Sequence, residues 1–352
     1  ETSADGKTFV KSAAVPIRLA RAGLPYDGRR FVALPAPLRA KAWRVSVRGV
    51  SPHVPAMKIS NLEYLSEARL PDARAKSLRE RLCGDYAQLP DGAAALPSER
   101  VVDLTGKMKA DGSLEWEAPE GDWTVVRLGY SANGRKNHPA TPSGTGLEVD
   151  KLDAAAVEAH FDAYAGKVMN RVGAGSAITG LLVDSYEMRS QNWTENLPRE
   201  FERRTGYALK PWYPALAGFP LVSAAETEKF LKDYRRVIGE LFTENYAGTL
   251  ARKCREKGLA FTLEPYGTAP ADNFEYGLAA DVPMSECWIG NPVDNGDFAA
   301  SVAHVKGARI VEAEAFTSMG GAPHDFKTLK AVADAAYAKG VNRLVFHRYV
   351  HK

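Results

Sequence analysis

The stretch Lys257-Gly-Leu-Ala-Phe-Thr-Leu-Glu-Pro265 links the end of a helical pattern to a short, mainly apolar run. Its glycine can take the left-handed conformation that often ends a helix. The run that follows lacks the polar alternation of a half-exposed strand, as expected of a strand that is covered on both faces of a parallel sheet. The stretch therefore indicates a helix–strand unit of an α/β fold.

The same pattern recurs along the chain beyond Gly121. It predicts strands at 123–131, 178–185, 259–265, 282–288, 309–316 and 343–349, with helices at 153–171, 197–205, 226–257 and 326–339. Six such strands approach a (β/α)8 TIM-type barrel without completing it. We therefore expect a barrel that is incomplete in this chain, with further strands beyond Lys352 or an irregular sheet.

The first part of the chain has a different texture. Apolar and polar residues alternate in short bursts at 31–50, 101–104 and 113–116, between glycines, prolines and aspartates. Asp111-Gly112 is a favourable hairpin turn, which predicts that the strands around Leu104 and Trp116 lie side by side. We expect a β-rich region of mainly antiparallel strands over residues 1–121 and a barrel domain over residues 122–352.

The bulk composition excludes several classes of partner. A net charge of +3 from 46 basic and 43 acidic residues, without a long basic block, argues against nucleic acid. No apolar run approaches the roughly 18 residues that span a bilayer. The three cysteines are far apart and match no metal motif, which fits a cytosolic enzyme and a large secreted protein equally. The localisation that we favour is secreted or periplasmic, although no signal peptide is visible; no feature indicates the oligomeric state.

Four predicted strands end in a glutamate, namely Glu187, Glu264, Glu286 and Glu314. A parallel barrel gathers the carboxyl ends of its strands around one mouth, so these residues are expected to face one ligand. Each glutamate alone could equally mark the point where a buried strand reaches water. Four at the same position favour a shared site.

Glycoside hydrolysis needs one carboxylic acid that protonates the leaving oxygen and one carboxylate that acts on water or on the sugar. Glu187 is the better candidate for the acid, because Asp184 could equally cap the turn after its strand. Glu314 is the better candidate for the base, whereas Glu312, on the same face, fits an interior hydrogen-bonding layer at least as well. Further acids could hold sugar hydroxyls or a calcium ion.

Aromatic residues accompany these acids. Trp193, Tyr266 and Trp288 offer flat faces on which sugars stack, although any one aromatic residue is more often part of a core. The histidines have no zinc-binding spacing. His347 follows an apolar run and could bind a substrate hydroxyl or be a structural histidine.

Several motifs, in order along the chain, together resemble glycoside hydrolase family 106, whose characterised members are α-L-rhamnosidases. They are Val183-Asp-Ser-Tyr-Glu-Met-Arg-Ser-Gln-Asn-Trp-Thr194, Phe201-Glu-Arg-Arg-Thr-Gly-Tyr207, Leu263-Glu-Pro-Tyr-Gly267, Ser285-Glu-Cys-Trp288, Glu314-Ala-Phe-Thr-Ser318 and Phe346-His-Arg-Tyr-Val-His351. The resemblance implies a (β/α)8 domain, inversion at the anomeric carbon and a calcium ion that helps to hold the sugar. It also implies that the chain is an excerpt or a truncated form, because family members are usually much longer.

The resemblance assigns roles to individual residues. Glu187 corresponds to the general acid, Glu314 to the base that activates water, Glu286 to a second acid near the base, and Glu264 to a sugar or metal contact. We place Asp184, Trp193, Tyr266, Trp288 and His347 with Glu264 among the substrate-binding residues. No residue is assigned as a metal ligand.

The leading hypothesis is an inverting, exo-acting α-L-rhamnosidase that releases terminal rhamnose from a glycan or glycoside. One alternative is a glycosidase of the same architecture that acts on another sugar, since pocket shape decides the sugar. Another is a carbohydrate-binding protein without catalysis. Several carboxylates at one mouth argue against pure binding, because clustered like charges cost free energy unless protons or a metal relieve them.

Overall fold

The computed structural model describes residues 1–12, 40–46, 68–79, 88–89, 92–138, 140–173, 176–189, 191–290, 296–318 and 324–347. The chain divides into two compact units. Unit 1 comprises Glu1–Gly129 and Phe201–Tyr234, and unit 2 comprises Tyr130–Glu200 and Arg235–Lys352. The division expected from the sequence, at residue 121, stays a prediction. No helix among the described residues is long and apolar enough to cross a membrane.

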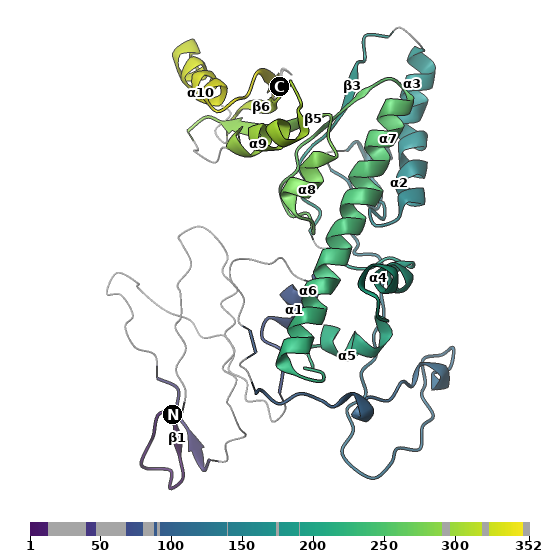
Figure 1. Ribbon diagram of the computed structural model, residues 1–352, viewed down its shortest axis with the longest axis vertical. Helices are drawn as coiled ribbons and strands as arrows, with labels where there is room; N and C mark the ends of the chain where they lie inside the picture. The colour runs from purple at the N-terminus through teal and green to yellow at the C-terminus, as the bar shows by residue number, and fades with distance from the viewer. Residues whose placement is uncertain are drawn as a thin grey trace. The chain divides into compact units, whose positions relative to one another are not determined.

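Unit 2 is built on a curled, five-stranded parallel sheet that forms half of a barrel (Figure 1). Its strands lie in the order of the chain: β3 (Gly180–Val183), β4 (Ala260–Leu263), β5 (Val282–Trp288), β6 (Glu312–Thr317) and β7 (Arg343–Phe346). All neighbouring pairs are parallel. This confirms an α/β fold with part of a barrel and five of the six strands expected from the sequence.

The sixth expected strand, at 123–131, is wrong: these residues form no strand. Trp123, Val125, Leu128 and Tyr130 are exposed by 38%, 59%, 44% and 65%. A strand needs a neighbour for its backbone hydrogen bonds, and this segment pairs with no strand of the described chain. An apolar run by itself is therefore not enough to predict a strand here.

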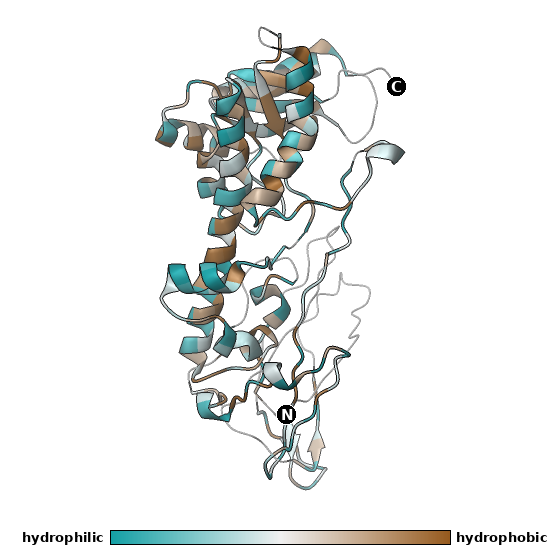
Figure 2. Cartoon of the chain, turned by 90° about the vertical axis from the view of Figure 1, so that its right-hand side faces the viewer, coloured by the Kyte–Doolittle hydropathy of each residue, from teal (hydrophilic) through white to brown (hydrophobic). Residues whose placement is uncertain are grey.

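Helices alternate with the strands of unit 2. They are α2 (Ala154–Phe161), α3 (Lys167–Val172), α7 (Thr249–Glu256), α8 (Asn273–Leu278), α9 (Gly296–Lys306) and α10 (Phe326–Ala338). π-helical turns, η4 (Asp162–Gly166) and η6 (Phe242–Gly248), interrupt two of the long helices that the sequence predicts. Hydrophobic and hydrophilic residues are interspersed along the helices (Figure 2).

Local signals explain where these helices begin and end. Asp153, Asp272 and Asp325 accept hydrogen bonds from backbone N–H groups in the first turns of α2, α8 and α10, groups that otherwise lack a helical partner. Gly258 and Gly340, after α7 and α10, have φ of 69° and 102°. The glycine stops expected from the sequence are confirmed.

The core of unit 2 beneath β5, β6 and β7 consists of small and medium apolar side chains. It contains Cys287, Ala299, Ala303, Val311, Ala313, Ala315, Ala336 and Val341. Small residues let α9 and α10 approach the sheet closely, and the tight packing holds the strand ends in place.

Unit 1 is less regular. It holds the antiparallel pair β1 (Thr2–Ser3) and β2 (Ala42–Trp43), together with α1 (Ala73–Lys76), η1 (Ser98–Arg100), η2 (Thr105–Lys107), η5 (Lys210–Trp212) and α5 (Tyr213–Leu216). α4 (Leu197–Thr205) and α6 (Ala224–Leu241) each have residues in both units, and η3 (Pro142–Gly144) belongs to unit 2. Most of the alternating stretch 31–50 lies outside the described residues.

The hairpin expected at Asp111-Gly112 is confirmed only as a turn. Gly112 has φ of 83°, and the Lys109 N–H donates to the Ser113 carbonyl at 2.9 Å. A single bridge joins Met108 and Leu114. The strands expected around Leu104 and Trp116 do not form, because η2 occupies the first of the two segments.

Candidate active site

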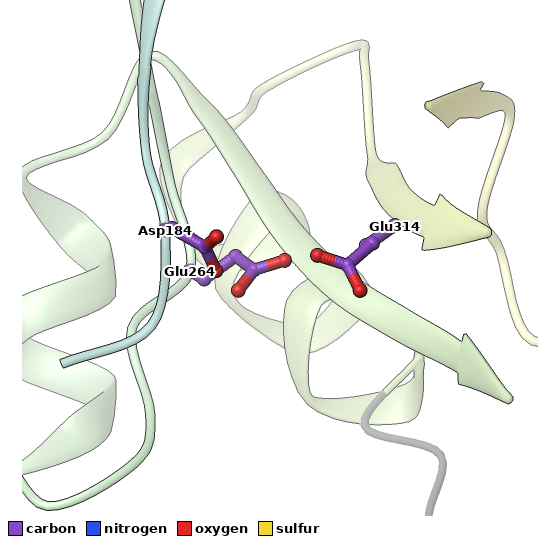
Figure 3. Close-up of side chains that lie close together, drawn as sticks. All are labelled: Asp184, Glu264 and Glu314. Atoms are coloured by element: carbon purple, nitrogen blue, oxygen red, sulfur yellow. The ribbon is translucent and has the colours of Figure 1, made fainter. Parts of the chain in front are cut away.

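Acidic side chains from distant parts of the chain meet at the carboxyl end of the unit 2 sheet. Val183 pairs with Leu263, so Asp184 and Glu264 follow the paired ends of β3 and β4. The ligand oxygens of Asp184, Glu264 and Glu314 all lie within 4.8 Å of one another. Figure 3 shows the Glu314 carboxylate, from β6, pointing toward that of Glu264. The convergence expected from parallel strands is therefore present.

Glu264 lies at the centre of this group and is fully buried. Its Oε2 accepts a hydrogen bond from the Ser185 N–H at 3.0 Å, whereas Oε1 has no partner among the described residues. Burial raises the pKa of Glu264 to about 10, and the neighbouring charges of Asp184, Glu314 and Glu286 contribute. Without a cation, this carboxyl is protonated near neutral pH.

Glu286 and Glu314 face each other across β5 and β6, where the strand register pairs them directly. Glu286 accepts a hydrogen bond from the Trp288 indole N–H at 2.8 Å. Burial raises the pKa of Glu286, the indole opposes the rise, and the charge of Glu314 adds to it. Two carboxyls at this spacing on one sheet face disfavour each other's charged form.

The Glu314 carboxylate has two polar neighbours at the site. Its Oε1 accepts a hydrogen bond from the Thr317 hydroxyl at 2.6 Å, and the His347 Nδ1 lies 3.4 Å from the same oxygen. Its side chain is 12% exposed, and that of His347 is 39% exposed. Thr317 was not among the candidates from the sequence, although its position three residues after Glu314 could have suggested this contact.

The loops after β3 and β4 are joined to each other. The Tyr186 N–H donates to the Tyr266 carbonyl at 3.3 Å, and the Thr268 N–H donates to the Tyr186 carbonyl at 2.7 Å. Gly267 has φ of 99°, and a Cβ there would lie 2.4 Å from the Tyr186 oxygen. Only glycine fits this close approach.

Tyr266 places a buried phenol beside the acids. It is 9% exposed, and its hydroxyl has no partner among the described residues. Burial, with the charges of Glu264 and Glu286, raises the pKa of Tyr266. The phenol is therefore protonated and can donate a hydrogen bond to a ligand in the site.

The structure places the remaining candidates in different surroundings. Glu187 is exposed, and its charge contributes to the raised pKa of Glu286. Trp193 stacks on Tyr130, with ring centroids 5.7 Å apart. Asp184 belongs to the acidic group and also accepts a hydrogen bond from the Ser185 N–H at 2.7 Å. Its role in binding a ligand stays a prediction.

Glu312 lies in the kind of interior environment that the sequence analysis weighed against a catalytic role. It is buried and forms an ion pair with Arg343. Glu312 therefore balances a charge within the sheet, and the catalytic roles assigned to the other acids stay predictions.

The Asp184, Glu264 and Glu314 group fits a hard cation. All of its ligand atoms are carboxylate oxygens, which calcium prefers. Oε1 of buried Glu264 has no hydrogen-bond partner among the described residues and could bind the cation. A divalent cation would also relieve the repulsion that raises the pKa of Glu264. The structure therefore offers a place that could hold a metal ion.

Comparison with known proteins places this geometry in a family. Residues 53–352 match the alpha-L-rhamnosidase model of glycoside hydrolase family 106. A solved rhamnosidase from Novosphingobium sp. PP1Y is similar with a TM-score of 0.68 and 30% identity, over 82% of this chain and 30% of that one. A Formosa agariphila protein provisionally named a beta-glucuronidase is 38% identical over 84% of this chain and 25% of its own length.

The chain spans only about a quarter to a third of these relatives' lengths. The match to the family model nevertheless covers most of the chain, and it includes every acid of the site. The chain belongs to glycoside hydrolase family 106.

Proposed function

We propose that this chain carries the catalytic part of an inverting, exo-acting α-L-rhamnosidase within a (β/α)8 barrel. The observation that carries this proposal is the group of acids at the strand ends. Burial raises the pKa of Glu264 and of Glu286, and the Glu314 carboxylate accepts a hydrogen bond from the Thr317 hydroxyl. Paired carboxyls with different environments are the acid and base of a glycosidase.

In the proposed reaction, Glu314 is the base and Glu187 is the acid. The Glu314 carboxylate takes a proton from water, whose oxygen bonds to the anomeric carbon as the bond to the leaving oxygen breaks. Glu187 gives its proton to that leaving oxygen. The raised pKa of Glu286 makes it the second candidate for the proton donor.

A calcium ion would be held by Asp184, Glu264 and Glu314. Such an ion supplies charge neutralisation and coordination for sugar hydroxyls. Glu314 lies in this group and is also the proposed base. A bound cation would therefore compete with the proton that Glu314 takes from water. Tyr266, Trp193, Trp288 and His347 are proposed to contact the sugar.

A neutral sugar suits this site better than an anionic one. The name of the Formosa agariphila relative points to a glucuronide. A glucuronate carboxylate would be repelled by the clustered acids unless a cation intervened, whereas rhamnose carries no charge. We therefore place rhamnose-containing glycans or glycosides first and glucuronides second. We also propose a secreted or periplasmic location.

The test is hydrolysis of chromogenic glycosides by the full chain, with α-L-rhamnoside and β-D-glucuronide in one panel. We expect release from the rhamnoside, with the inverted anomer appearing first by NMR. Glu187→Gln and Glu314→Gln should each lower kcat at least ~10²-fold, whereas Glu275→Gln, at an exposed position of α8, should not. Release from the glucuronide alone would overturn the sugar assignment. A large loss in Glu286→Gln but not in Glu187→Gln would move the acid to Glu286.

A further inference from the structure

A buried lysine lies behind the loop that carries Glu187. Lys151 is 4% exposed, and its ammonium forms an ion pair with Glu148. The same nitrogen lies 5.4 Å from the ring centroids of both Tyr186 and Tyr246. Tyr186 directly precedes Glu187. The cation–π contact between Lys151 and the Tyr186 ring therefore anchors the start of the loop.

The neighbouring aspartate holds the other end of the same loop. Asp150 accepts hydrogen bonds from the Gln191 side-chain amide at 2.5 Å and from the Thr194 hydroxyl at 2.8 Å. It also accepts the Leu152 N–H at 2.9 Å. Residues 148–151, the brace, therefore fasten the chain on both sides of Glu187.

A π-helical turn supports the brace from behind. Phe242 of η6 meets the Tyr186 ring edge-on, with centroids 5.1 Å apart. The Asn245 side-chain amide donates to the Leu152 carbonyl at 2.7 Å. π-helical turns change which side chains face a neighbour and often occur near functional sites. Through Phe242, Asn245 and Tyr246, this turn contacts Tyr186 in the loop, Leu152 next to the brace and Lys151 in the brace.

We propose that Lys151, with Asp150, is a positioning residue that sets the place of the Glu187 carboxyl. The inference rests on the proposed role of Glu187 as proton donor. A buried ion pair adds little net stability, because desolvation offsets the attraction between its charges. Its value here is geometric, since proton transfer is sensitive to displacements of about 1 Å.

Lys151→Met tests this with a matched control, Lys253→Met. Lys253 is also a mostly buried lysine; it pairs with Glu158 and Asp162 and lies 5.5 Å from the Phe161 ring centroid. Both variants lose a buried cation. Only Lys151 contacts the loop of Glu187.

The readout is the dependence of kcat on the leaving group. An activated aryl glycoside needs little proton donation, whereas an alkyl or sugar leaving group needs it fully. We expect Lys151→Met to lower kcat about 10²-fold on the alkyl glycoside and only a few-fold on the aryl glycoside, with KM little changed. Lys253→Met should show no such split. Equal effects of the two variants would overturn the proposal.

Two further measurements separate this proposal from the assignment of Glu187. If Glu187→Gln shows no leaving-group split, the acid assignment fails irrespective of Lys151. Amide hydrogen exchange of residues 186–189 and 191–194 in the full chain tests the brace without catalysis. It should become at least ~10-fold faster in Lys151→Met and Asp150→Asn but not in Lys253→Met. Unchanged exchange in Lys151→Met would overturn the proposal, whether or not the chain is active.

Discussion

The Glu264 carboxyl is buried away from water and has three acidic neighbours. Its burial and the charges of Asp184 and Glu314 keep the proton on the folded chain up to a pKa of about 10. The unfolded chain releases the same proton at the ordinary pKa of a glutamate. The contribution of Glu264 to the free energy of unfolding is therefore most favourable below the ordinary pKa, and it is lost as the pH rises toward 10.

Glu264→Gln should remove this pH dependence. Glutamine is neutral and keeps an oxygen for the Ser185 N–H. In chelator, between pH 6 and 8, the free energy of unfolding of the unmodified chain should fall relative to the variant by up to about 1.4 kcal/mol per pH unit. Urea unfolding at several pH values measures the difference. Glu275→Gln should follow the unmodified chain, and a constant gap between Glu264→Gln and the unmodified chain would contradict the raised pKa.

Gly267 makes a residue-scale prediction of a different kind. An added Cβ would meet the Tyr186 carbonyl at 2.4 Å, whereas a Cβ at Gly258, which also has positive φ, would meet nothing within 4 Å. Gly258→Ala should cost about 1 kcal/mol from backbone conformation alone. Gly267→Ala should cost at least ~2 kcal/mol more, because the two loops must separate. Urea unfolding compares them, and equal losses would mean that the close approach gives way easily.

At the scale of elements, the register between β5 and β6 sets the electrostatics of the site. It pairs Glu286 with Glu314 and Met284 with Glu312. A shift of one residue would send these side chains to the other face of the sheet. The raised pKa of Glu286 is therefore partly a property of strand pairing.

Glu314→Gln should lower the pKa of Glu286, because the charge of Glu314 contributes to raising it. NMR titration of labelled glutamate carboxyls measures the shift. Glu312→Gln, on the same strand, is the control: Glu312 is paired with Arg343, so we expect this substitution to change the pKa of Glu286 less. An unchanged pKa of Glu286 in Glu314→Gln would show that the charge of Glu314 does not raise it.

Sequence patterns predicted elements well where the signal was local. α4 lies at 197–205 and β5 at 282–288, as the apolar spacing indicated, and Gly258 and Gly340 end their helices. The strand expected at 123–131 failed because a strand depends on a partner elsewhere in the chain. The π-helical turns also escaped prediction, since a helical apolar pattern does not distinguish them from an α-helix.

At the scale of the whole molecule, a cation at Asp184, Glu264 and Glu314 would cross-link the ends of β3 and β4 to β6. A ligand that binds only the folded chain stabilises it by mass action. Acids separated by many residues would then be held by one ion, so metal affinity becomes folding stability.

Calcium should therefore raise the melting temperature of the chain, and chelator should reverse the rise. At a calcium concentration 100 times the dissociation constant, the stabilisation should reach about 2.7 kcal/mol. Asp184→Asn and Glu264→Gln should reduce the response strongly, whereas Glu187→Gln should keep it. Thermal unfolding monitored by circular dichroism measures the shift, and an equal response in Glu264→Gln would place the cation elsewhere.

By itself, the sequence determined most of the parallel α/β elements and the acids at or near the carboxyl ends of their strands, because strand period, helix caps and apolar runs are local properties. The motifs around Glu187, Glu264 and Glu314 also indicated the family, which the comparison confirmed. Only the tertiary structure decided which acids meet, that Glu264 is fully buried while Glu187 is exposed, and that Lys151 lies behind Tyr186. Burial and charge proximity depend on contacts between residues far apart in the chain, and these set the pKa values on which the proposed chemistry rests.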